Sequence, residues 1–278
     1  MEYSLGQLGH RDNTGANPPV AVAGVGDAVG VSPGWYHTCA HLSSGQVKCW
    51  GRNQRGQLGN GTMLQSIEHV VVVGIGDAVA VSAGSEHTCA LLSTGQVKCW
   101  GHNKFGQLGN GTIANSTEPV AVTGVSDGVE VFAGGSHACT LLSTGQVKCW
   151  GRNQKGQLGN GTMADSATPV AVTGVSDAME ISAGSLHTCA RLSTGQVRCW
   201  GDNRSGQLGN GTTTDSTTPV AVTGVSDAVE VAAGGGHTCA RLSTGQVKCW
   251  GLNKDGQLGN GTTTNSTTPV LVRGLCQP

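Results

Sequence analysis

The sequence has few charged and few aromatic residues. Charged side chains make up 12% of the 278 residues and aromatic ones 4%, whereas soluble proteins usually carry about 25% charged residues. Lys and Arg number 16 and Asp and Glu 17, which gives a formal net charge of -1. Because no basic run is present, we expect no nucleic-acid partner and no attraction to an anionic membrane surface.

Long apolar runs are also absent. No stretch reaches the roughly 18 apolar residues that a membrane-spanning helix needs. The first ten residues, MEYSLGQLGH, lack the basic and apolar segments of a signal peptide. We therefore expect no membrane insertion and no signal peptide in this chain.

Glycine, in contrast, is abundant. The chain contains 46 glycines, against an average share of about 7%. Each glycine inside a helix costs about 1 kcal/mol relative to alanine. This composition argues against a helical protein.

The sequence repeats with a period of 50 residues and no insertion. Trp-Gly recurs at Trp50, Trp100, Trp150, Trp200 and Trp250. The tetrapeptide GQLG begins at Gly6, Gly56, Gly106, Gly156, Gly206 and Gly256. A fixed period of this size indicates one repeat domain in which each unit buries its faces against its neighbours.

Each unit predicts four short strands, as residues 75–124 illustrate. Alternating valines at 77–84 indicate a first strand, and 87–101 indicates a hairpin with a Ser93-Thr94-Gly95 turn. Residues 119–122, PVAV, form the last strand, where proline is tolerated at an edge. Tandem units of four strands without a helix predict an all-β fold, a β-propeller of four-stranded blades. An open solenoid is the alternative.

The repeat resembles a known family. HTCALLSTGQVKCWG, followed by GQLGNGT and then PV, is similar to the repeat of the regulator of chromosome condensation family over essentially the whole chain. The resemblance implies a propeller, which in that family usually closes with seven blades. Here the single domain 1–278 divides into a partial blade 1–24, full blades 25–74, 75–124, 125–174, 175–224 and 225–274, and a tail 275–278. Five blades, six blades and part of a seven-bladed ring all remain open.

The eleven cysteines divide into five pairs and one remainder, Cys276. In the hairpin register Leu92 faces Gln96, which places Cys89 opposite Cys99. The pairs are Cys39 with Cys49, Cys89 with Cys99, Cys139 with Cys149, Cys189 with Cys199, and Cys239 with Cys249. Disulfides in every blade imply an oxidising, extracellular or periplasmic location. Reduced, buried cysteines in a cytoplasmic protein are the alternative.

Zinc binding is a second alternative for these cysteines. His87, Cys89 and Cys99 share a strand face and could hold Zn²⁺ with one open position. The spacing differs from the usual short chelating loops. We therefore expect no metal and no cofactor, and we expect the repeated histidines to be structural and to hydrogen-bond backbone groups.

Columns that vary between the units are candidates for function. They lie before the repeated histidine, after Trp-Gly, and before the Pro-Val strand, in loops that a propeller gathers on one face. Aromatic and basic residues, which are typical interface anchors, concentrate there toward the N-terminal blades. The candidate partner-binding residues are Trp35, Tyr36, Arg52, Arg55, His102, Phe105, Arg152 and Lys155. Drift of exposed loops without a function is the alternative.

Identical columns are interpreted as scaffold. The repeated tryptophans are expected to be wedges between blades. A plant ultraviolet photoreceptor of the resembling family uses clustered tryptophans, but here one recurs per blade and only Trp35 lies off the repeat.

The sequence favours a non-enzymatic scaffold that binds a protein partner of unknown identity. The resembling family includes a secreted bacterial inhibitor of β-lactamases, which acts by surface contact alone. Guanine-nucleotide exchange on a small GTPase, the role of the founding member, is one alternative, although no inserted wedge or basic tail is present. A structural or adhesive repeat array is another. No catalytic, cofactor-binding or metal residues are assigned.

Overall fold

The computed structural model describes residues 6–9 and 21–274. Over these residues the chain is all-β, with twenty strands in five four-stranded antiparallel sheets. We number these sheets blades 1 to 5. Blade 1 contains β1 (Ala28–Pro33), β2 (His37–Leu42), β3 (Val47–Gly51) and β4 (Ser66–Val71). Blade 2 contains β5 (Ala78–Ala83), β6 (His87–Leu92), β7 (Val97–Gly101) and β8 (Ser116–Ala121).

The other three blades repeat this pattern. Blade 3 contains β9 (Gly128–Ala133), β10 (His137–Leu142), β11 (Val147–Gly151) and β12 (Ser166–Ala171). Blade 4 contains β13 (Ala178–Ala183), β14 (His187–Leu192), β15 (Val197–Gly201) and β16 (Ser216–Ala221). Blade 5 contains β17 (Ala228–Ala233), β18 (His237–Leu242), β19 (Val247–Gly251) and β20 (Ser266–Leu271).

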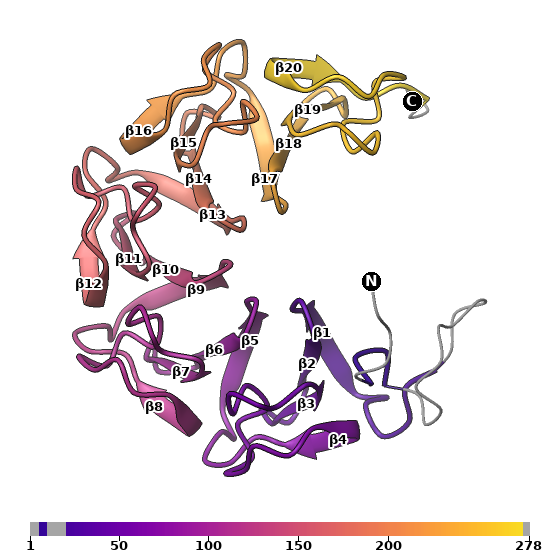
Figure 1. The fold of residues 1–278 in the computed structure, drawn as a ribbon, viewed down its shortest axis with the longest axis vertical. Helices are drawn as coiled ribbons and strands as arrows, with labels where there is room; N and C mark the ends of the chain where they lie inside the picture. Colours follow the sequence, from indigo (N-terminus) through magenta and orange to yellow (C-terminus); the bar gives the residue numbers. More distant parts are fainter. Residues whose placement is uncertain (1–5, 10–20, 275–278) are drawn as a thin grey trace.

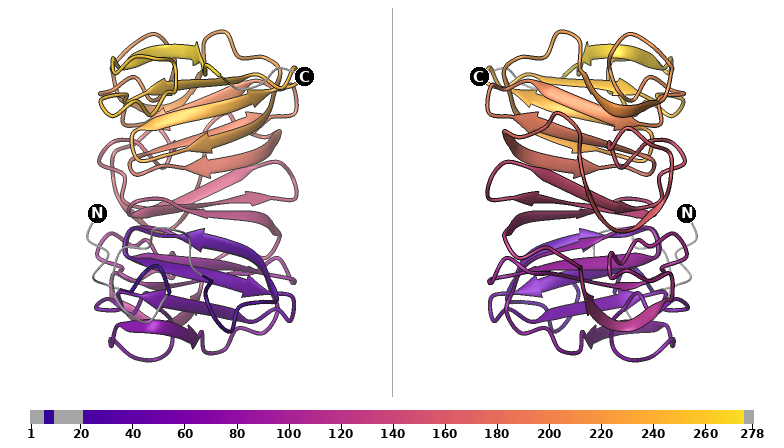
Figure 2. Two further views of the ribbon diagram at one scale, coloured as in Figure 1. Left: turned by 90° about the vertical axis from the view of Figure 1, so that its right-hand side faces the viewer. Right: turned by 90° about the vertical axis from the view of Figure 1, so that its left-hand side faces the viewer.

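The blades lie around a common axis, as predicted for a propeller. The first strand of each blade is innermost and the fourth is outermost (Figure 1). The five blades form an arc that is open between blade 1 and blade 5 (Figure 1). Side views show the sheets stacked one on the next (Figure 2). Of the predicted partial blade 1–24, only residues 6–9 and 21–24 fall within the described residues.

The hairpin register is the one that the sequence predicts. Leu92 N–H donates to Gln96 O at 2.9 Å, and Cys89 pairs with Cys99 across β6 and β7. Gly95 closes the turn with a φ of 81°, in the left-handed region that glycine adopts without strain. All five predicted cysteine pairs are disulfides with a sequence separation of 10. Their sulfurs are therefore unavailable as the thiolate ligands that the zinc alternative requires. Cys276 lies outside the described residues.

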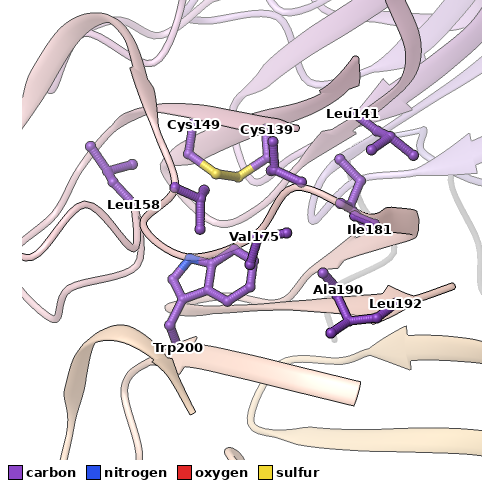
Figure 3. Close-up of a cluster of buried hydrophobic side chains, with 12 residues drawn as sticks. Cys139, Leu141, Cys149, Leu158, Val175, Ile181, Ala190, Leu192 and Trp200 are labelled. Carbon is purple, nitrogen blue, oxygen red and sulfur yellow. A yellow bond between two sulfur atoms is a disulfide. The ribbon is translucent and has the colours of Figure 1, made fainter. Parts of the chain in front are cut away.

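The core is divided among the interfaces between successive blades. Trp200 of blade 4 packs against Val175 of its own repeat unit and against Leu158 and the Cys139–Cys149 disulfide of blade 3 (Figure 3). Its Nε1–H donates to Gln157 O at 2.9 Å, so the indole is also hydrogen-bonded to the preceding blade. The tryptophans at the same position in blades 2, 3 and 5 are also 0% exposed. This confirms the predicted wedge role.

Three of the repeated histidines link their blade to the following one. His37 Nε2 lies 2.8 Å from Thr88 Oγ1, and His137 Nε2 lies 2.9 Å from Thr188 Oγ1. His187 Nε2 makes the same contact with Thr238 at 2.9 Å. The expectation of a backbone partner was wrong for these three histidines, because their Nε2 contacts a threonine hydroxyl of the next blade. For His87, a backbone hydrogen bond to His137 does contribute.

This series of contacts has one gap, which a single substitution should fill. His87 Nε2 lacks this threonine contact, because the residue at the threonine position of blade 3 is Ala138. In Ala138→Thr, the new hydroxyl can accept from His87 and donate to Gln107 O, as Thr88 donates to Gln57 O at 2.9 Å. We expect the free energy of unfolding to rise by about 1 kcal/mol, measured by urea denaturation.

The reverse substitution is the matched control. Thr188→Ala removes the hydroxyl that contacts His137, so it should destabilise the protein by about 1–3 kcal/mol, the cost of leaving buried polar groups unpaired. An Ala138→Thr protein no more stable than the wild type would show that the introduced hydroxyl does not make the two hydrogen bonds.

A half-buried carboxyl group, that of Glu130, lies on the inner strand of blade 3. Glu130 Oε2 accepts from Ile181 N–H of blade 4 at 2.9 Å. The residue across from Glu130 is Leu141, whereas Glu180 at the same position of blade 4 faces Arg191 at 3.0 Å. Burial without its own cation raises the pKa of Glu130 to about 7, and the negative charge of Glu180 adds to this. Ile181 N–H and the more distant Arg191 oppose the increase.

Glu130→Gln should therefore stabilise the protein in a pH-dependent way. The folded-state pKa lies above the unfolded value, so the folded protein holds the proton more tightly and loses stability as the pH rises from about 4.5 through 7. Glutamine keeps an acceptor for Ile181 N–H and carries no charge. At pH 8 we expect a gain of about 1–2 kcal/mol, less than the full shift implies because water reaches part of the group.

The measurement is the difference in unfolding free energy between variant and wild type from pH 5 to pH 8. The gain should shrink steadily toward the acidic end, as the pH approaches the unfolded-state pKa near 4.5. Glu230→Gln is the matched control, because Glu230 is exposed and paired with Arg241 at 3.0 Å. A gain for Glu130→Gln that does not change with pH would contradict the assignment.

Candidate partner-binding face

The varied loops gather on one face of the arc, which we call the variable face. It consists of the loops joining the first and second strands and those joining the third and fourth strands of each blade. Backbone hydrogen bonds hold the two kinds of loop together: Arg52 N–H donates to Tyr36 O at 2.8 Å, and Arg152 N–H donates to Ser136 O at 2.9 Å. The near-identical hairpin turns lie at the opposite ends of the strands. The chain thus separates its varied surface from its repeated one.

A buried asparagine shapes each longer loop of the variable face. Asn53 Oδ1 accepts from Leu58 N–H at 2.9 Å, and its Nδ2 donates to Thr62 O and Leu64 O at 3.0 Å each. Gln57 Oε1 accepts from Arg55 N–H at 2.9 Å. The same contacts recur in the other blades, so the loop backbone is fixed while its exposed side chains vary. The sequence analysis did not single out this asparagine, although its exact 50-residue recurrence marked it.

Glu86 organises the candidates at the boundary of blades 1 and 2. Arg52 Nη1 lies 3.2 Å from Glu86 Oε1, while Arg55 Nε and His102 Nδ1 lie 3.9 Å from Oε2. The Arg52 guanidinium is also 5.2 Å from the Tyr36 ring centroid. Three of the eight candidates, Arg52, Arg55 and His102, therefore converge on one carboxylate, which the sequence analysis did not select.

Phe105 links blades 2 and 3. Its ring centroid is 6.3 Å from that of His102 in an edge-on arrangement, and Arg152 lies 5.1 Å from the same ring. Gln107 Nε2 is 3.1 Å from His102 Nδ1. Burial, together with the nearby cations Arg55 and Lys104, lowers the pKa of His102, and Glu86 opposes that decrease.

The last candidate, Lys155, is engaged in an ion pair with blade 4. Its Nζ lies 2.8 Å from Asp215 Oδ2 and 3.9 Å from Asp202 Oδ1. Asp202 also pairs with Arg204 at 2.7 Å. The positive charge of Lys155 is thus already compensated within the protein.

Trp35 is the most exposed of the candidate aromatics. Its relative exposure is 58%, whereas the other five tryptophans are at most 3% exposed. The ring lies edge-on to Tyr36 at 6.4 Å. An indole exposed on a rigid loop is a typical anchor for a protein interface.

A pocket of about 370 Å³ opens beside Trp35. Residues of blades 1 to 4 line it, including Trp35, Tyr36, Glu86, Arg152 and Leu186. A second hollow of about 220 Å³ lies over the central axis, lined by the glycines that recur at the start of the first loop of each blade. The pocket joins Trp35, Tyr36 and Arg152 in one concave surface; the remaining candidates lie outside its lining.

The described residues hold no group of three or more His, Cys, Asp and Glu side chains placed to bind a metal ion. None of the described segments forms a helix that could cross a membrane.

Comparison with known proteins identifies the fold. The family model described as RCC1-like domain matches residues 2–277. No curated protein sequence matches the chain. The crystal structure of human WBSCR16 aligns with a TM-score of 0.82 and 22% identity, covering 90% of this chain and 68% of that one.

Two further solved structures are similar. Prp20p from Saccharomyces cerevisiae, studied with its binding properties to Gsp1p and histones, has a TM-score of 0.79 and 21% identity, covering 89% of this chain and 63% of its own. The CRINKLY WD40 ectodomain of the Arabidopsis thaliana receptor kinase ACR4 has a TM-score of 0.50 and 25% identity. It covers 81% of this chain and 64% of its own. This chain thus spans about two thirds of the length of each relative.

Proposed function

Because the chain belongs to the RCC1-like domain family, we propose that it is a non-enzymatic scaffold whose variable face binds a protein partner. The observation that carries this proposal is the exposed Trp35 beside a pocket formed by four blades. Every other tryptophan of the described chain is buried between blades, so the exposure of Trp35 has no structural explanation.

The relatives support a binding role. Yeast Prp20p is described with binding to Gsp1p and histones, and the yeast RCC1 structure was solved with Kap60 bound. In each case the partner is a protein, although identities near 20% transfer the fold alone to this chain.

We also propose that the protein acts in an oxidising compartment, outside the cytoplasm. Five cross-strand disulfides support this location, because such bonds persist where thiols are not kept reduced. The similar receptor-kinase ectodomain shows that a related repeat architecture occurs on the outer side of a cell.

Site-specific photocrosslinking tests the binding role. A benzophenone amino acid at position 35 should capture a discrete partner from an extract of the source cells. The same group at position 44, in the exposed turn at the opposite ends of the strands, should not. Mass spectrometry of the adduct then identifies the partner class, and a small GTPase would assign an exchange role. Equal or no capture at both positions would reject the variable face as the binding surface.

A further inference from the structure

Two arginines at equivalent positions of the repeat meet different partners. Arg52 and Arg152 each follow Trp-Gly, 100 residues apart. Arg52 pairs with Glu86, the residue immediately before the histidine of the next blade, at 3.2 Å. The residue at that position beside Arg152 is Leu186. The same position thus carries an arginine in two repeats, but only Arg52 has a carboxylate at the facing position.

Arg152 has no carboxylate partner among the described residues. Its Nη2 donates to Gln154 Oε1 at 2.9 Å, and its guanidinium lies over the Phe105 ring. Its Nε is buried and has no hydrogen-bond acceptor. The neighbouring cations Lys155 and Arg204, in contrast, both pair with aspartates of blade 4. The charge of Arg152 is therefore uncompensated, and one of its donors is unsatisfied.

This arginine lies in the lining of the 370 Å³ pocket, together with Leu186, Trp35 and Tyr36. One part of the pocket is thus cationic, and Trp35, Tyr36 and Leu186 give it an apolar part. Three serines, Ser85, Ser136 and Ser185, complete the lining together with Gly135 and Glu86. Glu86 also lines the pocket, but its charge is offset by Arg52 at 3.2 Å and Arg55 at 3.9 Å. The pocket therefore complements a ligand that places a negative charge next to an apolar group.

We propose that the pocket binds an acidic side chain of the partner, an Asp or Glu flanked by aromatic or aliphatic residues, with its carboxylate on Arg152. The carboxylate takes the place that Glu86 occupies beside Arg52. The flanking apolar side chain packs against Trp35 and Leu186. An arginine held over an aromatic ring is preorganised for such a contact. This inference rests on the proposed protein-binding function and specifies the chemistry of the contact.

Two capped tripeptides test it, Ac-Phe-Glu-Phe-NH₂ and Ac-Phe-Gln-Phe-NH₂. Binding is followed by the change in tryptophan fluorescence on addition of peptide, which is assigned to Trp35 because the other five tryptophans are buried away from the peptide. The wild-type protein should bind the Glu peptide at least about tenfold more tightly than the Gln peptide, as expected for a charge-assisted pair. Equal affinity for the two peptides would overturn the proposal.

Three variants locate the preference. Arg152→Gln should remove it. Leu186→Glu should also remove it, because an internal carboxylate then pairs with Arg152 as Glu86 does with Arg52. Arg204→Gln is the matched control, since Arg204 is an exposed cation of the same face that already pairs with Asp202, and it should keep the preference. A preference retained in folded Arg152→Gln protein would overturn the proposal, whatever the behaviour of Leu186→Glu.

The two levels of the proposal fail separately. Partner capture at position 35 with equal binding of the two peptides would leave the scaffold function standing and reject the acidic contact. Selective peptide binding without capture at position 35 would support the acidic contact in the pocket and reject the variable face as the surface that binds a protein partner.

Discussion

Acidification from neutral pH to about pH 5 is expected to destabilise the protein strongly, because four buried histidines resist protonation in the folded state. His37, His87, His137 and His187 are 0% exposed. Burial lowers the pKa of His37 and His137 to about 4 and of His87 and His187 to about 3. In the unfolded chain each would titrate at its ordinary value near 6.5.

The direction in which stability changes with pH follows from proton binding. Between the folded and unfolded pKa values the unfolded state binds more protons, so stability falls as the pH drops below about 6.5. Relative to neutral pH, each histidine lowers the free energy of unfolding at pH 5 by about 2 kcal/mol, and the four together lower it by roughly 8 kcal/mol. Domains are usually stable by only about 5–15 kcal/mol. Glu130 opposes this trend with a single proton and cannot cancel it.

Urea denaturation followed by circular dichroism from pH 7.5 to 4.5 measures the effect. His87→Asn provides the matched variant, because His87 lacks the threonine partner that the other three contact. As the pH falls, the unfolding free energy of this variant should decrease less steeply than that of the wild type. The two slopes should differ by about 1.4 kcal/mol per pH unit. A wild-type protein that stays equally stable down to pH 4.5 would show that these histidines are accessible to protons when folded.

Reduction of the five disulfides is expected to have the second large effect. Each closes a loop with a sequence separation of 10, which contributes about 2.5 kcal/mol in the chain-entropy model. Together they contribute roughly 12 kcal/mol, comparable to the whole stability of a domain. We expect the melting temperature of reduced and alkylated protein to fall by about 30 °C or more.

Calorimetry of the oxidised and the reduced, alkylated protein makes this comparison. Two double substitutions to alanine then separate chain entropy from packing. Removing Cys139 and Cys149, which pack against Trp200 of the next blade, should cost more than removing Cys239 and Cys249 of blade 5. Reduced protein that melts within a few degrees of the oxidised form would show that the disulfides contribute little to stability.

The hairpin register, the disulfide pairs and the wedge tryptophans could all be predicted because local rules determine them. A three-residue turn with glycine in the left-handed region fixes which residues face each other. Because the sequence repeats every 50 residues, the same register occurs in each blade. The threonine partner of the histidines could not be found in this way. It lies 51 residues away on another blade, and only the packing of successive blades brings the two side chains together.

The candidate site was predicted only in part for the same reason. Side-chain type and variation selected Trp35, Tyr36 and Arg152, which the pocket does bring together. Glu86 and Leu186 occupy varied columns but were passed over, since neither is an aromatic or basic anchor. Their importance comes from what faces Arg52 and Arg152 across the blade boundary. Comparing the residue after each Trp-Gly with the residue before the next repeated histidine would have shown this difference.

The hydrogen bonds between successive blades have a consequence for the coding sequence. The hydrogen bonds that join one blade to the next span 51 residues for His37 and Thr88, 31 for Thr88 and Gln57, and 43 for Trp100 and Gln57. Recombination between near-identical repeats in the coding sequence would add or remove one whole unit and keep these sequence separations at the new junction. A change of length by one blade therefore leaves the spacing of the contacts between successive blades unchanged. Point changes such as Leu186 give the individual copies their separate identities.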